Sequence, residues 1–487
     1  MLRLFVPQVV RDAPRHALAM QADGRSLSPW IPARLCEKRD DNDPNARDHQ
    51  RMSTEARERL SIDDTQILRL ESSAIKGHTG KVLILAPDSS GEALSVTSLR
   101  RRVAERLGSY PRLSQRVVEP RFGLGRPAWV TAQEVDLEWH VAQPGHADAL
   151  SDEELRQAVG EVLSERLDHT RPLWRLDTLP LTGNRVAIVG RIHHAMADGV
   201  SGIRLAAGLL WDEDSSAPAP RPAAQAPSPT PHAPSPAAGE ARILVRLPAA
   251  LWRELRPGRD TKLDQHIGPG REVAWTTFPL QRLKRIEQGA AERVTVNDVV
   301  LAVVAGGLRR WLPEVGGIAE NLRVQCPVCL HAREEEKGQL GNRDSFMNVD
   351  LPIAEEDPVE RLRFINAETR ERKFDHDADT LYAFFHAIGR FRPLYKGVTR
   401  LTSGPREFAL SVSNVPGPRE RAVILGHGVE QFCSFAEPAD RHALRISIIS
   451  LGGELAFGLC SDPEAISNLD GLRGALADSI AELEGSV

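Results

Sequence analysis

A short apolar run that leads into a pair of histidines constrains the fold of this chain more than any other stretch. Residues 186–190 read Val-Ala-Ile-Val-Gly, and a short β-branched run of this kind is typical of a buried strand. His193 and His194 follow, and Asp198-Gly199 then indicates a turn. The small and apolar residues from Val200 to Leu210 predict a helix behind the turn. We therefore expect a strand, a loop and a helix, with both histidines at the end of the strand.

The two adjacent histidines are expected to have different roles. Side chains alternate along a strand, so His193 and His194 should point in opposite directions, and one can reach a substrate while the protein holds the other. A neutral imidazole is suited to take a proton from an alcohol or an amine at pH 7. A histidine pair at a strand end also occurs as a hydrogen-bonded core pair, and these residues alone do not decide. Because the two rings point apart, a zinc site on His193, His194 and Asp198 is disfavoured, and we predict no metal.

Length, charge and cysteine usage narrow the class of protein. The chain has 487 residues, enough for two domains with substantial cores, and its net charge of −5 gives no indication of nucleic-acid binding. Its apolar runs are too short to span a membrane. The five cysteines are too few for a disulfide framework and predict a reduced, cytoplasmic protein. Cys326 and Cys329 form a CxxC, which we interpret as two free thiols on a buried strand rather than a zinc or redox site.

A change in composition predicts the domain organisation. Residues 1–51 are polar and should be a disordered extension, with Met52 as the natural start. Residues 52–211 then form a first subdomain, and residues 212–240, rich in Pro, Ala and Ser, form an extended linker. Residues 241–487 form a second subdomain. Its opening segment, residues 241–256, is an Arg-bearing helix, either facing the core or lying on anionic lipid.

Periodicity and capping residues predict the other elements. A short helix that Ser61 or Asp63 can cap is expected to run through Ile67, Leu68 and Leu70. Further helices are expected near 98–107, 151–163, 280–288, 295–311, 357–374 and 469–483. Strands are expected near 82–86, 138–141, 174–179, 273–278, 322–328, 347–351, 408–415, 443–450 and 454–460, the last two as a hairpin around Gly452-Gly453.

Three further stretches carry polar or aromatic residues at the ends of these elements. Pro172-Leu173-Trp174 enters a strand, where Trp174 either serves a site or is a packed aromatic residue. Asn297 and Asp298 lie in the first turn of a helix that Thr295 or Asn297 can cap, and they can also serve a site there. Ser413 and Asn414 end a strand before Pro416.

These stretches match one known family in order. The chain resembles the bacterial wax ester synthase/diacylglycerol acyltransferase family, within the CoA-dependent acyltransferase superfamily, from about Leu60 to the C-terminus. The matching stretches are Leu60–Asp64, Pro172–Trp174, the HHxxxDG motif from His193 to Gly199, Asn297–Ala302, Gly341–Arg343 and Ser413–Pro418. It departs from the family at Cys329-Leu330-His331, where the family usually has Ser-Leu-Arg, and at Leu451-Gly452-Gly453, which lacks a Tyr-Asn.

The resemblance implies an α/β fold of two chloramphenicol-acetyltransferase-like subdomains, each a mixed sheet with flanking helices, with a tunnel at their interface. It implies acyl-CoA as co-substrate without a further cofactor, a long-chain alcohol or diacylglycerol as acceptor, and formation of wax esters or triacylglycerol. His194 would be the general base, His193 would support the loop, Asp198 would fix the loop by pairing with an arginine, and Gly199 would permit the turn. The expected substrate-binding residues are Asn297, Asp298, Ser413, Asn414, Pro172 and Trp174.

Other functions remain open at this point. A serine hydrolase is disfavoured because the chain has no G-x-S-x-G sequence. A condensation-type acyltransferase that acts on a specialised-metabolite acceptor would carry the same histidine motif. A non-catalytic protein that binds lipid or acyl-CoA is the third alternative. Peripheral contact with the inner face of a membrane or with lipid bodies also stays open.

Overall fold

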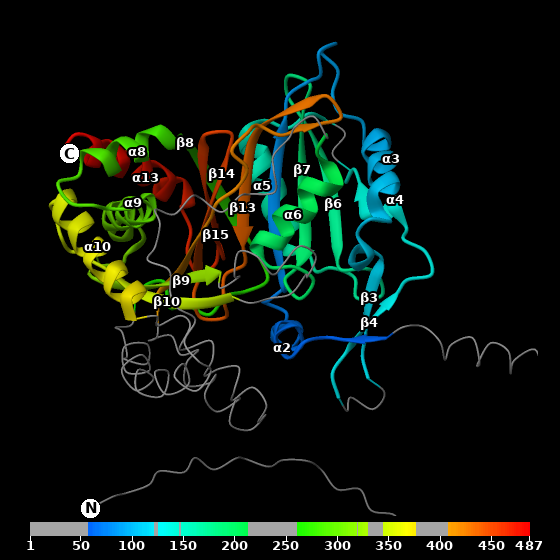
Figure 1. The fold of residues 1–487 in the computed structure, drawn as a ribbon, viewed down its shortest axis with the longest axis horizontal. Coiled ribbons are helices and arrows are strands. Elements are labelled where there is room, and N and C mark those ends of the chain that lie inside the picture. The colour runs from blue at the N-terminus through cyan, green and yellow to red at the C-terminus, as the bar shows by residue number, and fades with distance from the viewer. Residues whose placement is uncertain are drawn as a thin grey trace, which may run out of the picture. The chain divides into compact units, whose positions relative to one another are not determined.

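The described part of the chain is built around two large β-sheets. The computed structural model describes residues 57–120, 125–145, 148–212, 261–318, 320–329, 344–375 and 408–487. Within these ranges each large sheet has six strands, and a small third sheet has the order β1-β4-β3 (Figure 1). Its strands are β1 (Glu58–Arg59), β3 (Gln115–Val118) and β4 (Ala128–Thr131).

The first large sheet has the order β12-β13-β2-β7-β6-β5. Its strands are β2 (His78–Leu85), β5 (Val141–Ala142), β6 (Trp174–Leu181), β7 (Arg185–His193), β12 (Val423–Ile424) and β13 (His427–Ala436). The sheet is mixed, because β5 pairs with β6 in parallel and the other neighbours are antiparallel. In the β2–β7 pair His78 lies opposite His193, which fixes the face on which each side chain emerges.

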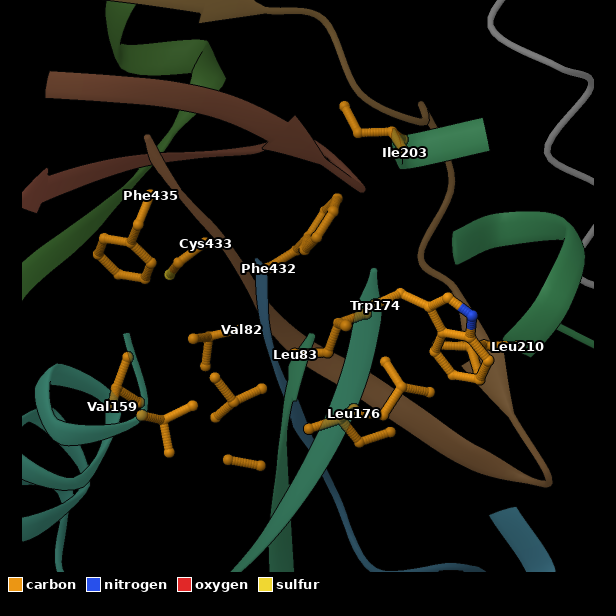
Figure 2. Packing of buried hydrophobic residues seen from close by; sticks show 14 of the residues in the cluster. Val82, Leu83, Val159, Trp174, Leu176, Ile203, Leu210, Phe432, Cys433 and Phe435 are labelled. Carbon is orange, nitrogen blue, oxygen red and sulfur yellow. The ribbon is translucent and has the colours of Figure 1, made fainter. Parts of the chain in front are cut away.

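Helices cover both faces of this sheet. On one face, Gly80 of β2 lies against Leu163 of α5 (Asp152–Ser164). On the other, Ile192 of β7 lies against Gly202 of α6 (Gly199–Leu210), which packs on α3 (Val96–Leu107). Figure 2 shows the two layers of buried side chains, with Val82 beside Val159 on the α5 side and Leu83 beside Trp174 on the α6 side. The predicted capping box of α5 is confirmed, since Ser151 and Glu154 cap each other's backbone N–H groups.

The second large sheet has the order β10-β9-β11-β14-β15-β8. Its strands are β8 (Glu272–Pro279), β9 (Leu322–Cys329), β10 (Asp344–Leu351), β11 (Leu410–Val415), β14 (Leu444–Leu451) and β15 (Glu454–Ser461). The central strand β11 pairs in parallel with both β9 and β14. The predicted β14–β15 hairpin is confirmed, and both of its turn glycines have a positive φ.

A layer of helices packs on the second sheet. These helices are α8 (Leu280–Gly289), α9 (Val296–Trp311), α10 (Pro358–Asp375) and α13 (Leu469–Glu484), and Figure 1 shows them together on one side of the strands. The apolar residues of α9 are buried on nearly all sides because α8, α10 and α13 all contact it. None of the helices in the described ranges is both long and apolar enough to span a membrane.

Strand β13 connects the two halves of the chain. It lies late in the sequence, yet it pairs along β2 in the first sheet, from Val429 opposite Leu85 to Ala436 opposite Thr79. It also packs against β14 and β15 of the second sheet, where Ala436 N donates to Ser447 Oγ at 3.1 Å. The first sheet therefore contains strands from both sides of the predicted linker, so its fold depends on residues of both predicted subdomains.

One predicted strand is wrong. The pattern Glu138 to Val141 predicts a strand, but residues 137–140 form the short helix α4 (Leu137–His140). The reason is a local cap: Asp136 Oδ1 accepts from the N–H groups of Glu138 and Trp139, which favours a helical turn over extension.

Several predictions lie outside the described residues. They concern the extension 1–51, nearly all of the linker 212–240, the helix 241–256 and the stretch Gly341–Arg343. Of the CxxC pair, Cys326 is buried on β9, and the side chain of Cys329 is not described.

Candidate active site

The HHxxxDG motif forms a tight turn between β7 and α6. His193 is the last residue of β7, and Met196 N donates to its carbonyl at 2.8 Å. His194 N donates to the carbonyl of Gly77, which precedes β2, at 2.8 Å. Asp198 then caps α6, since its Oδ1 accepts from Ser201 N at 2.6 Å. Backbone and capping contacts thus hold the turn on both sides of His194.

The side chain of His193 is fully buried and occupied by contacts within the protein. Its Nδ1 accepts from Ala195 N at 3.1 Å, and its Nε2 lies 2.7 Å from Glu71 Oε1. Glu71 follows the helix α2 (Ile62–Leu70), which Ser61 caps. His193 is therefore placed to support the loop, as the resemblance implies.

His194 is the histidine whose environment suits a general base. Burial lowers the pKa of its partly buried imidazole to about 4, and the nearby charge of Arg445 lowers it further, while Asp198 opposes the shift. The ring is therefore neutral at pH 7. A neutral imidazole has a nitrogen lone pair that can accept a proton from a substrate.

The carboxylate of Glu437 holds the backbone segment that accepts the hydrogen bond from His194 N. Glu437, just after β13, accepts from Lys76 N at 2.7 Å and from Gly77 N at 2.8 Å. Arg271 Nη2 donates to the same carboxylate at 2.7 Å. Gly77 has φ of +76°, and a Cβ there would lie 2.3 Å from His193 Nε2, so the position requires glycine.

The structure brings two of the predicted substrate-binding residues into contact. Asn414 Nδ2, near the end of β11, donates to Asn297 Oδ1 in the first turn of α9 at 3.3 Å. Ser413 precedes Asn414 on β11, so its side chain lies on the opposite face of the strand, with Oγ 3.4 Å from Ser447 Oγ. A Cβ on Gly199 would lie 3.7 Å from Val415, so the histidine motif meets the same end of β11.

The other predicted substrate-binding residues have structural contacts. Asp298 is 1% exposed, and its carboxylate accepts from Thr295, as part of a capping box, and from Thr369 Oγ1 at 2.6 Å. Trp174 is 3% exposed, donates to Leu113 O at 2.7 Å and stacks on His140. Pro172 is buried, and its carbonyl accepts from Trp174 N. Thr295 is thus the cap of α9, and Trp174 is the packed aromatic residue that its position at a strand entry permits.

The structure adds two details about Gly199 and Asp198 of the motif. Gly199 does not have a positive φ; it is the first residue of α6, so the turn does not depend on the conformational freedom of this glycine. The side chain of Asp198 is 1% exposed and caps α6, which is consistent with a structural role.

Sequence reasoning missed Glu71, Glu437 and Arg445. Glu71 and Glu437 are separated from the histidine motif by more than a hundred residues and reach it only through the folded sheet. A single acidic residue after a helix or a strand carries no signal of such a contact. The described residues contain no cluster of three or more side chains suited to hold a metal ion.

Comparison with protein families extends these observations to most of the chain. The model of the wax ester synthase/diacylglycerol acyltransferase catalytic domain matches residues 60–256, and that of the WS/DGAT C-terminal domain matches residues 340–484. A relative from Mycobacterium tuberculosis, named "Putative diacyglycerol O-acyltransferase Rv0221", is 28% identical over 455 residues, which cover 87% of this chain and 95% of the relative.

Solved structures agree on the fold. A wax ester synthase/diacylglycerol acyltransferase from Marinobacter aquaeolei VT8 superposes with a TM-score of 0.63 at 24% identity, covering 88% of this chain and 98% of that one. The first condensation domain of the calcium-dependent antibiotic synthetase superposes with a TM-score of 0.58 at 17% identity, covering 88% and 96%. The expected fold class is confirmed, and the chain belongs to the wax ester synthase/diacylglycerol acyltransferase family of acyltransferases.

Proposed function

We propose that this acyltransferase moves a fatty acyl group from acyl-CoA to the hydroxyl of a long-chain alcohol or of diacylglycerol, with His194 as the general base. The observation that carries the proposal is the position of His194 at a strand end, next to a histidine that is buried on Glu71. Burial also lowers the pKa of His194 to about 4, so its imidazole is neutral at pH 7. Acyl-CoA is the co-substrate, and the reaction needs no further cofactor. A tunnel between the two sheets would admit the two substrates from opposite sides.

The proposed step balances without an acyl-enzyme. The acceptor hydroxyl gives its proton to His194 as its oxygen attacks the thioester carbonyl carbon. The tetrahedral intermediate collapses, the carbon–sulfur bond breaks, and the departing CoA thiolate takes the proton back from His194. General-base assistance of this kind contributes roughly 10²–10⁴-fold to a rate. The thioester is already activated, so this assistance suffices for direct transfer.

The pair of Asn297 and Asn414 is the proposed site of oxyanion stabilisation. An amide nitrogen carries two hydrogens, and the contact between the pair uses one hydrogen of Asn414 Nδ2. The second hydrogen can stabilise the negative charge that develops on the carbonyl oxygen.

An acceptor panel tests the proposal. Purified protein is given acyl-CoA with a long-chain alcohol, a diacylglycerol or an amine, and CoA and the acylated product are quantified by chromatography. We expect CoA release to require an alcohol or diacylglycerol and to fall by orders of magnitude in His194→Ala, with the circular dichroism spectrum unchanged. Preference for the amine would support the condensation-type alternative, and binding of acyl-CoA without turnover would support a binding protein.

The proposed acceptors are insoluble in water, which motivates a proposed location. We expect the protein in the cytoplasm, in peripheral contact with the inner membrane face or with lipid bodies. Flotation with anionic vesicles tests this contact, and protein that stays at the bottom of the gradient at low salt contradicts it.

A further inference from the structure

The buried carboxylate of Glu71 is in hydrogen-bond contact with three side chains. Its Oε1 lies 2.7 Å from His193 Nε2 and 2.9 Å from His169 Nε2. Its Oε2 accepts from Arg166 Nη2 at 2.6 Å. The Glu71 side chain is 7% exposed, whereas Arg166 and His169 are 47% and 44% exposed. The carboxylate therefore has one fully buried partner, His193, and two partners at the surface.

The contacts of His193 determine where its proton lies. Ala195 N is a backbone donor, so His193 Nδ1, which accepts from it at 3.1 Å, carries no hydrogen. The single hydrogen of the ring must then be on Nε2, and it points at Glu71 Oε1. A carboxylate can only accept, so Glu71 selects this tautomer and disfavours the other.

The tautomer bears on His194 through the backbone. The bond from Ala195 N to His193 Nδ1 and the bond from Met196 N to His193 O close the turn around the residue between them. If the hydrogen moved to Nδ1, the ring would face Ala195 N–H with a second donor, and the first of these bonds would be lost. Unpaired buried donors are costly, so the turn would rearrange.

We propose that Glu71 is a positioning residue of the acyl-transfer reaction: it fixes the Nε2–H tautomer of His193 and thereby holds the turn that presents His194. The inference rests on the proposed role of His194. Arg166 and His169 contact the same carboxylate at the surface, and the contact of Glu71 with His193 does not require either of them.

The electrostatics of the cluster agree with this role. Burial tends to raise the pKa of Glu71, but its hydrogen bonds to His169 and His193 outweigh burial and lower that pKa to about 2. Glu71 is therefore ionised at any pH at which the enzyme would work. In return, the hydrogen bond to Glu71 raises the pKa of His169.

Two variants of Glu71 and one control separate positioning from simple packing. Glu71→Gln keeps an oxygen that can accept from His193, Glu71→Ala removes it, and His169→Gln disturbs the carboxylate while leaving the His193 contact in place. The readouts are kcat and KM for acyl-CoA, and the nitrogen chemical shifts of the His193 ring by ¹⁵N NMR, assigned from the signal missing in His193→Asn. The shifts report the tautomer directly, and a packing defect alone would not change them.

We expect the wild type to show His193 as the Nε2–H tautomer and Glu71→Ala to lose that single state. Its kcat should fall by roughly 10–100-fold, the range known for partners that orient metal-bound histidines, with little change in KM. Glu71→Gln should recover most of kcat, and His169→Gln should stay close to wild type.

Each contrary result overturns the inference. An Nδ1–H tautomer in the wild type, a wild-type kcat in Glu71→Ala, or an equal loss in His169→Gln would each refute positioning by Glu71. If Glu71→Ala does not fold, the tautomer of the wild type and the kcat of Glu71→Gln still decide whether Glu71 positions His193. If the wild type itself transfers no acyl group, the proposed function fails, and the tautomer measurement separately decides whether Glu71 controls His193.

Discussion

The pH dependence of acyl transfer should reveal the unusual pKa of His194. Burial, with help from Arg445, lowers that pKa to about 4 from an ordinary value of 6.5. At pH 5.5 roughly a tenth of an ordinary histidine is neutral and able to act as a base. With a pKa near 4, more than roughly nine-tenths of His194 stays neutral at the same pH. Activity should therefore persist at pH 5.5 and decline only as the pH approaches 4.

The assay is kcat/KM for acyl-CoA, which reports the free enzyme, measured from pH 4 to 8 by quenched chromatography of CoA. Enzyme held at each pH and assayed again at pH 7.5 controls for unfolding. Arg445→Gln removes a positive charge near His194, so the acidic decline should move to higher pH, whereas Arg445→Lys should leave it nearly in place. A wild-type decline centred near pH 6.5, or one unmoved by Arg445→Gln, would refute a desolvated His194 base.

Three further predictions concern stability, each measured by urea unfolding at pH 7. Lys81 is buried and donates to Ser434 Oγ, and burial lowers its pKa to about 8, so its charge costs the fold about 3 kcal/mol. Lys81→Met should therefore stabilise the protein by about 2 kcal/mol after loss of that hydrogen bond. A lower free energy of unfolding in Lys81→Met would contradict this account. Arg191 pairs with Asp177 at 2.8 Å, and both side chains are 2% exposed, so Arg191→Met should lower the free energy of unfolding by about 3–5 kcal/mol. As a control, Arg185→Met breaks the more exposed pair with Asp152 and should cost at most about 1 kcal/mol. Gly417→Ala would place a Cβ 1.9 Å from the carbonyl oxygen of Ser450, which should lower the free energy of unfolding by about 1–3 kcal/mol. Gly428→Ala is the control, because a Cβ there meets open space. Equal losses in the two variants would show that the clash does not matter.

The sequence predicts those elements whose stabilising contacts are local. The capping box of α5 lies within four residues, and the turn of the β14–β15 hairpin lies in two adjacent glycines, so both are visible without the fold. The short helix α4 shows the limit of pattern reading. The cap by Asp136 outweighs the β-branched and aromatic residues that favour a strand.

The candidate site likewise contains residues that the sequence predicts and contacts that only the fold creates. His193 and His194 form a contiguous motif, and alternation at the end of β7 predicts that their side chains point in different directions. The contact of Asn297 with Asn414 joins two predicted residues, but nothing in the sequence pairs them. Glu71 and Glu437 act across more than a hundred residues, and such contacts depend on the order of strands in the sheet. That order includes β13 beside β2, which periodicity cannot predict.

The placement of β13 means that the backbone contacts of the turn bearing the HHxxxDG motif are completed late in synthesis. Until the ribosome has added Glu437, the N–H groups of Lys76 and Gly77 lack their carboxylate, and one edge of β2 has no neighbouring strand. An unpaired edge of this kind invites association with other chains. The amino-terminal half is therefore a poor folding unit by itself, and a nascent chain would be most exposed to aggregation before β13 emerges.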